Sequence, residues 1–232
     1  MQFNVGTSGY CYPGWKGSFY PAALPQKAML PYYSQRFSTV ELNNTFYRMP
    51  GEATIASWMG QVPDAFRFAV KVPQTMTHHK RLKGVGPDVE YLFSALSVLK
   101  HRLGPLLFQL PPNFKKDLPR LNECLNLIGD RIAAFEFRHP SWFDDDVFES
   151  LRAHDCALCA ADVDEADPAK RVGTAKWGYV RLRRETYTDR ELQQWIDRLS
   201  CQKWNRVYVY FKHDDVGNGA RLAARFLEFV NA

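Results

Sequence analysis

The stretch TVELNNTFYRMP, residues 39–50, begins as a strand that is apolar on one side and polar on the other. Its first residues, TVEL, have the β-branched and apolar character of a strand. Successive strand residues point to opposite faces, so Val40 and Leu42 share one face while Glu41 and Asn43 share the other. A carboxylate and an amide on the inner face of a core strand indicate a polar interior, since burying them in an apolar core is costly.

The composition is that of a soluble globular protein, with 232 residues of which 46% are hydrophobic and 24% are charged. This length allows one or two domains, and an α/β barrel would use it as one. No apolar run reaches the roughly 18 residues that a membrane helix needs, and the opening MQFNVGTSG lacks a signal-peptide pattern. We therefore expect a cytoplasmic protein that has no membrane partner.

The five cysteines predict reduced thiols, because their number is odd and they show no paired framework. Cys156 and Cys159 form a C-x-x-C pair inside a strand-like run, whereas redox pairs usually lie where a helix begins and zinc sites need a second pair. We expect both thiols to pack in the core. Motifs for phosphate loops, dinucleotide binding and zinc proteases are absent, so no cofactor is predicted.

Strand-like runs alternate with segments of helical periodicity along the whole chain. The runs are 3–8, 39–43, 66–72, 105–110, 133–139, 156–163, 177–183 and 206–212. The clearer helical segments are 89–103, 118–129, 145–154, 189–200 and 219–230. This alternation predicts an α/β fold with a parallel sheet, and eight such units predict a single-domain (β/α)8 TIM-type barrel over residues 1–232. A doubly wound open sheet is the alternative.

In a barrel, alternate strand residues face the outer helices or the interior, and one choice of side per strand gathers charges inside. The acidic members of this predicted interior set are Glu41, Glu136 and Asp162. The basic members are Arg67, Lys71, Arg138, Arg181 and Lys212, and polar members include Ser8, Asn43 and Gln109. Most lie near the carboxyl ends of their strands, where barrel enzymes keep their chemistry. The surplus of bases suits a phosphate or carboxylate, although mutually compensating ion pairs that only fill the barrel are the structural alternative.

The loops after the first and third strands carry further candidates. GYCYPGWKGSFYP, residues 9–21, includes Tyr10 and Trp15, whose rings either form one wall of a binding site or pack over the barrel mouth. The loop after the third strand contains His78 and His79. Adjacent histidines point in different directions, so we expect at most one of them, His78, to act as a ligand or an acid/base.

The loops after the fifth and eighth strands are also polar. RHPSW places Trp142 close to Arg138. KHDDVGNGA, residues 212–220, brings His213, Asp214 and two glycines to the start of a helix. Backbone N–H groups at such a start form an anion site in many barrels, but a turn with an N-cap explains the same residues.

Several motifs together resemble one known family. They are GTSGY (6–10), PGWKGSFYP (13–21), FSTVELNNTFYRMP (37–50), FRFAVKVP (66–73), LGPLLFQLPPNF (103–114), FEFRHPSWF (135–143) and VYVYFKHD (207–214). They resemble the uncharacterised family catalogued as domain of unknown function 72, also called YecE-like, whose members fold as TIM-type barrels. The resemblance implies that fold and no established activity. It also implies a set of signature residues: Gly6, Ser8, Gly9, Glu41, Asn43, Thr45, Tyr47, Lys71, Gln109, Pro111, Glu136, Arg138, Trp142 and Arg181. Many relatives have Asn where Lys212 and His213 stand here.

The leading hypothesis is an enzyme that acts on a small anionic, phosphorylated or sugar-like substrate at the barrel mouth by general acid/base chemistry. The predicted catalytic residues are Glu41, Lys71, Glu136, Asp162 and His78. The predicted substrate-binding residues are Ser8, Tyr10, Trp15, Asn43, Tyr47, Gln109, Arg138, Trp142, Arg181 and Lys212. Neighbouring cations should lower the pKa of Lys71 and permit proton transfer or a Schiff base.

Two other classes of function stay open. A divalent-metal-dependent hydrolase, nuclease or isomerase would use Glu41, Glu136 and Asp162 with His78 or His213, although the interior cations would repel the ion. A non-enzymatic nucleic-acid-binding protein is compatible with the net charge of +5 and the basic KRLK stretch. The sequence favours an interior site over a surface, because the unusual charges lie within strands.

Overall fold

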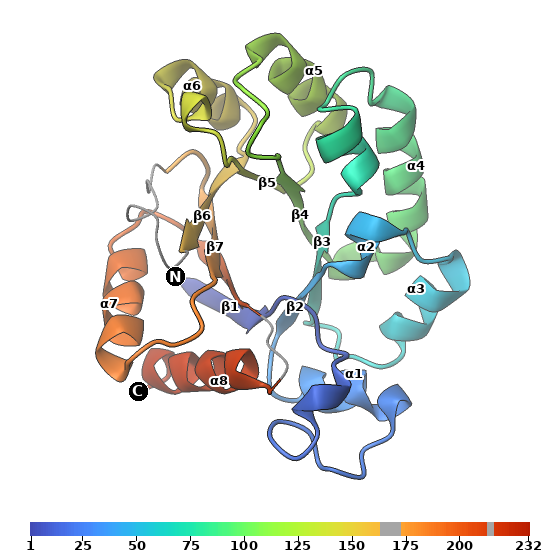
Figure 1. Ribbon diagram of the computed structural model, residues 1–232, viewed down its shortest axis with the longest axis vertical. Coiled ribbons are helices and arrows are strands. Elements are labelled where there is room, and N and C mark those ends of the chain that lie inside the picture. The colour runs from blue at the N-terminus through green and yellow to red at the C-terminus, as the bar shows by residue number, and fades with distance from the viewer. Residues whose placement is uncertain (163–172, 213–215) are drawn as a thin grey trace.

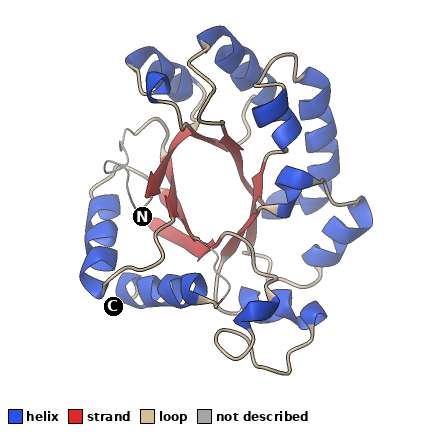
Figure 2. Cartoon of the chain, in the orientation of Figure 1, coloured by secondary structure: helices blue, strands red, loops and turns tan. Residues whose placement is uncertain are grey.

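The computed structural model describes residues 1–162, 173–212 and 216–232. Its strands form one parallel eight-stranded sheet in the order β1-β8-β7-β6-β5-β4-β3-β2. They are β1 (Gln2–Thr7), β2 (Thr39–Leu42), β3 (Arg67–Lys71), β4 (Leu103–Gln109), β5 (Ala133–Glu136), β6 (Ala157–Asp162), β7 (Trp177–Leu182) and β8 (Arg206–Phe211). β1 and β2 lie side by side, joined by a parallel bridge between Ser8 and Glu41. The nearly closed barrel (Figure 2) confirms the predicted TIM-type fold and excludes the open sheet.

Helices surround the barrel on its outer side (Figure 1). They are α1 (Met29–Ser34), α2 (Asn44–Tyr47), α3 (Glu52–Met59), α4 (Gly86–Leu96), α5 (Leu118–Ile128), α6 (Asp145–Ala153), α7 (Asp189–Ser200) and α8 (Asn218–Val230), with short helical turns η1 (Pro13–Trp15), η2 (Gln26–Ala28), η3 (Thr75–His79), η4 (Ser97–Arg102) and η5 (Pro140–Trp142). No helix in the described ranges is long and apolar enough to cross a membrane. The sequence signals for α7 are clear, since Thr188 and Glu191 form a capping box at its start.

One predicted helix differs from the structure. The segment 89–103 is not a single helix, because α4 ends at Leu96 and the chain continues in the tighter turns of η4. Within η4, Lys100 has a φ of 49°, a left-handed conformation that interrupts the helical path. β4 therefore begins at Leu103, before the predicted start of the strand.

Two apolar layers lie on either side of the strands. Outward residues such as Val40, Phe108 and Phe135 pack in the layer under the helices, where the Phe108 and Phe135 rings stack 4.9 Å apart. The barrel interior holds a separate cluster: Ala69, Leu107, Ala134, Ala157, Cys159, Trp177, Tyr179, Tyr208 and Tyr210. On β7, this cluster precedes Arg181 along the strand. It therefore fills the barrel beneath the polar side chains at the carboxyl ends.

β6 does not follow the predicted alternation. Cys159 belongs to the interior cluster and pairs with Tyr179, so Asp162, three residues later, faces the other side of the strand. The Asp162 carboxylate accepts hydrogen bonds from Arg184 Nε and Tyr187 OH, both at 3.0 Å. The prediction that Asp162 points into the barrel is therefore wrong.

The cause is steric. Tyr179 and Arg181 of β7 fill the interior next to β6, so that β6 contributes only the small inward side chains of Ala157, Cys159 and Ala161. Arg67 also leaves the predicted interior set, because it lies at the amino end of β3 and donates to the Phe66 and Asp64 carbonyl oxygens.

The C-x-x-C cysteines are free and buried on opposite sides of this strand. Cys156 packs in the outer layer and Cys159 in the interior cluster. Their predicted packing role is confirmed.

The Tyr33 hydroxyl of α1 links β1 to β2 by hydrogen bonds where the barrel closes. It accepts a hydrogen bond from Thr7 N at 2.8 Å and donates one to Thr39 O at 3.1 Å. Gly6 is required at this junction, because a Cβ there would lie 2.0 Å from Thr39 O. The side-chain hydroxyl thus replaces part of the backbone ladder between the first and last strands of the sheet order.

Candidate functional site

Arg181 of β7 lies between two glutamates inside the barrel. Its Nη2 is 2.8 Å from Glu41 Oε1 of β2, and its Nη1 is 2.6 Å from Glu136 Oε2 of β5. None of the three side chains is more than 4% exposed. An unpaired buried carboxylate costs several kcal/mol, so the guanidinium stabilises both acids at once. The structure therefore brings together three residues that the sequence predicted for the site.

Glu41 has a full set of hydrogen-bond donors. Its Oε1 also accepts from Ser8 Oγ at 2.7 Å and from Asn43 Nδ2 at 3.2 Å, while Oε2 accepts from Tyr179 OH at 2.7 Å. The Glu41 carboxylate of β2 is therefore bonded by Ser8, which follows β1, by residues of β7, and by Asn43, which follows β2. Ser8 and Asn43, both predicted to bind substrate, here bind the carboxylate.

Glu136 is held in a similar way from neighbouring positions. Its Oε1 accepts from Gln109 Nε2 of β4 at 2.7 Å and from Arg138 Nε at 3.2 Å. Gln109 is buried, whereas the Arg138 side chain is 41% exposed, so Arg138 extends from the buried triad toward solvent. Among the described residues, Arg181 Nε is a buried donor without a hydrogen-bond partner.

Both carboxylates are held in the ionised form. Burial alone would raise the pKa of Glu136, but Arg181, Arg138 and the Gln109 hydrogen bond outweigh it and lower the pKa to about 2. Burial opposes ionisation of Glu41 too, and Arg181 with the Tyr179 and Ser8 hydrogen bonds still lowers its pKa. Two carboxylates with these pKa shifts are suited to fix Arg181 in place and poorly suited to accept a proton near neutral pH.

Lys71 is the last residue of β3 and lies near this triad. Its Nζ lies 4.0 Å from the centre of the Phe46 ring, and no carboxylate in the described ranges forms an ion pair with it. Thr45 Oγ1 donates to the Lys71 carbonyl oxygen at 2.7 Å, which ties α2 to the end of β3. Burial, followed by the nearby Arg181 charge, lowers the pKa of the Lys71 ammonium to about 8.

Arg183 lies near the same charged groups, although it was not among the residues predicted for the site. It follows β7 two residues after Arg181 and is half-buried. Burial, and then the Arg181 charge, lowers the pKa of its guanidinium, with Glu41, Glu136 and Arg138 also acting on it. The alternation that placed Arg181 inside also indicates Arg183, and that signal was available in the sequence.

His78 lies in η3 near the same group of cations. Its Nδ1 is 2.9 Å from Thr77 Oγ1, and its ring packs edge-on against Phe46 with centroids 5.0 Å apart. Burial, then the Lys71 and Arg138 charges, lowers its pKa, so the ring is held mainly neutral near pH 7. His78 and Lys71 therefore both contact the Phe46 ring.

The predicted aromatic contacts separate into buried and exposed residues. Trp15 and Trp142 are fully buried. Trp142 Nε1 donates to Phe114 O at 2.7 Å, and its ring stacks on Phe137 with centroids 4.7 Å apart. Both tryptophans therefore pack beneath the loops and present no surface to a substrate. Tyr10 is half-buried and Tyr47 is 75% exposed.

The donor set of the metal alternative is not assembled in the described residues. Glu41 and Glu136 are both bonded to Arg181, and Asp162 faces the outer side of β6. No group of three or more His, Cys, Asp or Glu side chains in the described ranges could hold a metal ion. His213, the other residue considered for this role, lies outside the described residues, as does Asp214.

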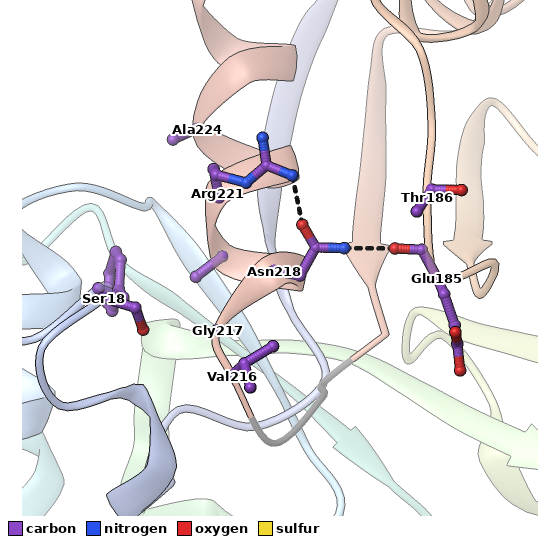
Figure 3. A pocket seen from close by; sticks show the side chains of 10 residues that line it. Ser18, Glu185, Thr186, Val216, Gly217, Asn218, Arg221 and Ala224 are labelled. Carbon is purple, nitrogen blue, oxygen red and sulfur yellow. Dashed lines mark hydrogen bonds between the residues drawn. The ribbon is translucent and has the colours of Figure 1, made fainter.

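The start of α8 lines a separate pocket of about 700 Å³ (Figure 3). Gly217, the N-cap, has a φ of 82°, and a Cβ there would lie 2.7 Å from Ser18 Oγ. Asn218 accepts from Arg221 Nη2 at 2.6 Å and donates to the Glu185 carbonyl oxygen. Within the described residues, no side-chain hydrogen bond caps the helix at Gly217. Lys212, just before this segment, is half-buried.

The chain is similar to proteins from several bacteria. It is 27% identical to the UPF0759 protein YunF of Bacillus subtilis (strain 168), over 98% of this chain and 94% of that protein. It is 34% identical to the UPF0759 protein YecE of Escherichia coli (strain K12), over 48% of this chain and 42% of that protein.

Solved structures agree with the barrel. The crystal structure of a DUF72 family protein from Thermotoga maritima MSB8 superposes with a TM-score of 0.88 at 27% identity, and covers 100% of both chains. A second DUF72 structure, from Enterococcus faecalis V583, shares the fold with a TM-score of 0.84 at 17% identity, over 100% of this chain and 96% of that one.

A family model described as "Protein of unknown function DUF72" matches residues 4–232. The chain therefore belongs to the DUF72 family, for which no substrate or reaction is established.

Proposed function

We propose that this protein is an enzyme that binds a small anionic substrate at the carboxyl ends of the barrel strands and transfers a proton through Lys71. The observation that carries the proposal is an imbalance of charge. Glu41 and Glu136 are balanced by their ion pairs with Arg181 and Arg138. Lys71 and Arg183 add two further positive charges and form no ion pair with a carboxylate among the described residues, although Glu41 and Glu136 act on both at longer range. Partly buried cations without a partner are stabilised by an anionic ligand.

Lys71 is the best candidate for the reacting group. With a pKa of about 8, a useful fraction of its amine is neutral near physiological pH, while the ammonium form persists beside it. Glu41 and Glu136 are too strongly ionised for this work, so we assign them the positioning of Arg181 and Arg138. Arg138, Arg183 and Lys71 would hold the anion, with neutral His78 as a second acid/base group.

Calorimetric titration of the purified protein with inorganic phosphate, and with pyrophosphate, tests the anion site. We expect Lys71→Met and Arg183→Met each to weaken binding roughly tenfold or more, as for the loss of a charge-assisted hydrogen bond. Arg190→Met is the matched control, because it removes the same charge from an exposed residue of α7. Equal affinities in all four proteins would overturn the proposal.

The proton-transfer role is tested separately. Suppose that a panel of phosphorylated sugars yields a substrate. The Lys71→Met variant should then no longer turn it over, but should still bind it in part through Arg138 and Arg183. Turnover that persists in Lys71→Met at the normal rate would remove Lys71 from the chemistry and leave only anion binding.

A further inference from the structure

A pocket distinct from the one at the start of α8 adjoins the proposed anion site. Its volume is about 830 Å³, and it lies between α2 with the turn that follows it, the residues after β3, and α4. Phe46 is common to both places, since it lines this pocket and its ring also contacts Lys71 Nζ at 4.0 Å. Lys71 and this pocket are therefore both adjacent to the Phe46 ring.

The pocket has an unusual wall. Tyr47 is 75% exposed and Tyr91 is 62% exposed, and both line it. Among the large hydrophobic side chains in the described ranges, only Val216, at 68%, is as exposed as these two. Folding gains little from such rings, because they bury little apolar surface. Exposed aromatic side chains gathered at one pocket instead mark a binding surface for a flat apolar group.

The other lining residues fit the same kind of ligand. Met49 and Pro73 add apolar surface, and Arg48 adds a cation. The acidic lining residue Asp88 is already paired with Lys80 at 2.6 Å, so it offers little repulsion to an anion. The pocket is much larger than inorganic phosphate requires, and its size is typical of sites for small organic ligands.

We propose that the substrate is a nucleoside phosphate whose phosphate lies on Lys71, Arg138 and Arg183 and whose base lies against Tyr47 and Tyr91. This inference rests on the proposed anion site and names the class of its substrate. In a nucleotide a flat π-system, the base, is joined through a sugar to a phosphate, which matches an aromatic pocket that shares the Phe46 ring with Lys71. A sugar phosphate would satisfy the cations and leave the tyrosines uncovered.

The test compares ligands that share the phosphate and differ in the base. Inorganic phosphate, glucose 6-phosphate, AMP, UMP and a 5′-phosphorylated tetranucleotide are titrated calorimetrically into the protein. We expect AMP and UMP to bind roughly 5- to 100-fold more tightly than the first two ligands, the range for stacking one base on aromatic side chains. A tetranucleotide that binds more tightly still would identify a strand end as the source of the nucleotide, and equal affinity would identify the free nucleotide.

Variants of the tyrosines locate the base. Tyr47→Ala and Tyr91→Ala should each weaken AMP binding several-fold and leave phosphate binding unchanged, whereas Tyr47→Phe should retain AMP binding because it keeps the ring. Val216→Ala is the matched control, since Val216 is 68% exposed but lines the pocket beside α8. Circular dichroism would confirm that these exposed substitutions leave the fold intact.

The outcomes separate this inference from the proposed function. If AMP binds no better than phosphate or glucose 6-phosphate while Lys71→Met still weakens phosphate binding, the nucleotide inference is overturned and the anion site stands. If Lys71→Met changes neither phosphate nor AMP affinity, the anion site itself is wrong. If AMP binds tightly but Tyr47→Ala and Tyr91→Ala have no effect, the base lies elsewhere and the inference is also overturned.

Discussion

Arg181 Nη1 lies 2.6 Å from Glu136 Oε2, with 2% of the arginine side chain and 4% of the glutamate side chain exposed. The same guanidinium reaches Glu41 through Nη2, so one cation joins strands on two sides of the barrel. The contact between Arg181 and Glu41 explains how the core strand β2 can carry a buried carboxylate. The acid is stabilised by a base from another strand, and by hydroxyl and amide donors that leave none of its oxygen atoms unpaired.

Removal of that base should be severe. We expect Arg181→Met to lower the free energy of unfolding by about 3–5 kcal/mol, because it leaves two buried carboxylates without their shared partner. Urea denaturation followed by circular dichroism measures the loss, with Arg190→Met as the neutral control. Adding Glu41→Gln and Glu136→Gln to Arg181→Met should recover part of the loss, because buried amides carry no charge. A change below about 1 kcal/mol in Arg181→Met would contradict this account.

Stability should also depend on acid pH through Glu136. Its pKa is about 2 in the folded protein and 4.5 in the unfolded chain, so below pH 4.5 the unfolded state takes up a proton that the folded state does not. The free energy of unfolding should therefore fall as the pH is lowered from about 4.5 to about 2. In Glu136→Gln the fall over this range should be smaller, while Glu149→Gln, an exposed site on α6, should retain it. Identical slopes in both variants would argue against Glu136 as the source.

Lys71 should titrate apart from the other lysines. After reductive methylation with ¹³C-formaldehyde, we expect one methyl resonance to shift with a midpoint near pH 8, while ordinary lysines titrate near 10.4. That resonance should be missing in Lys71→Arg. Saturating phosphate should raise its midpoint, because a bound anion favours the ammonium form. A spectrum in which every lysine titrates above pH 9.5 would rule out a poised amine.

Gly6→Ala should disrupt the junction of β1 and β2. The added Cβ would lie 2.0 Å from Thr39 O, so the two strands must separate, and we expect a loss of about 2 kcal/mol or more in unfolding free energy. Gly51→Ala is the control, because no atom lies within 4 Å of a Cβ built there. Thermal denaturation of both variants measures the difference, and equal melting temperatures would show that the junction tolerates a side chain.

The strands were predictable from sequence wherever one face is apolar and the other is charged. In β2, β5 and β7 the alternation around Glu41, Glu136 and Arg181 leaves one sensible orientation, and the structure has it. β6 reads ALCAAD, in which both faces carry small or apolar residues, so its lone acid decided the choice wrongly. The missing information was the bulk of Tyr179 and Arg181 on the adjacent strand, which only the three-dimensional pairing supplies.

The candidate site was predictable in part for the same reason. The triad and Lys71 follow from strand periodicity, whereas Trp15 and Trp142 do not, because an aromatic loop residue has the same sequence appearance when it packs and when it binds. Periodicity also indicates Arg183, which becomes a site residue once its strand neighbours are placed. The low pKa of the two glutamates depends on distances to Arg181 that no sequence pattern encodes.

Ser8 and Glu41 make the last bridge of the sheet, and the Ser8 hydroxyl also bonds to the Glu41 carboxylate. The two residues that form this bridge between β1 and β2 thus also take part in the buried network of charged side chains. A substitution of Ser8 or Glu41 will weaken the contact between β1 and β2 and will also disturb the buried charged residues. Such a variant therefore cannot separate an effect on folding from an effect on activity. Lys71 and Arg183 take no part in the contact between Ser8 and Glu41. They are therefore the positions at which effects on folding and on activity can be separated.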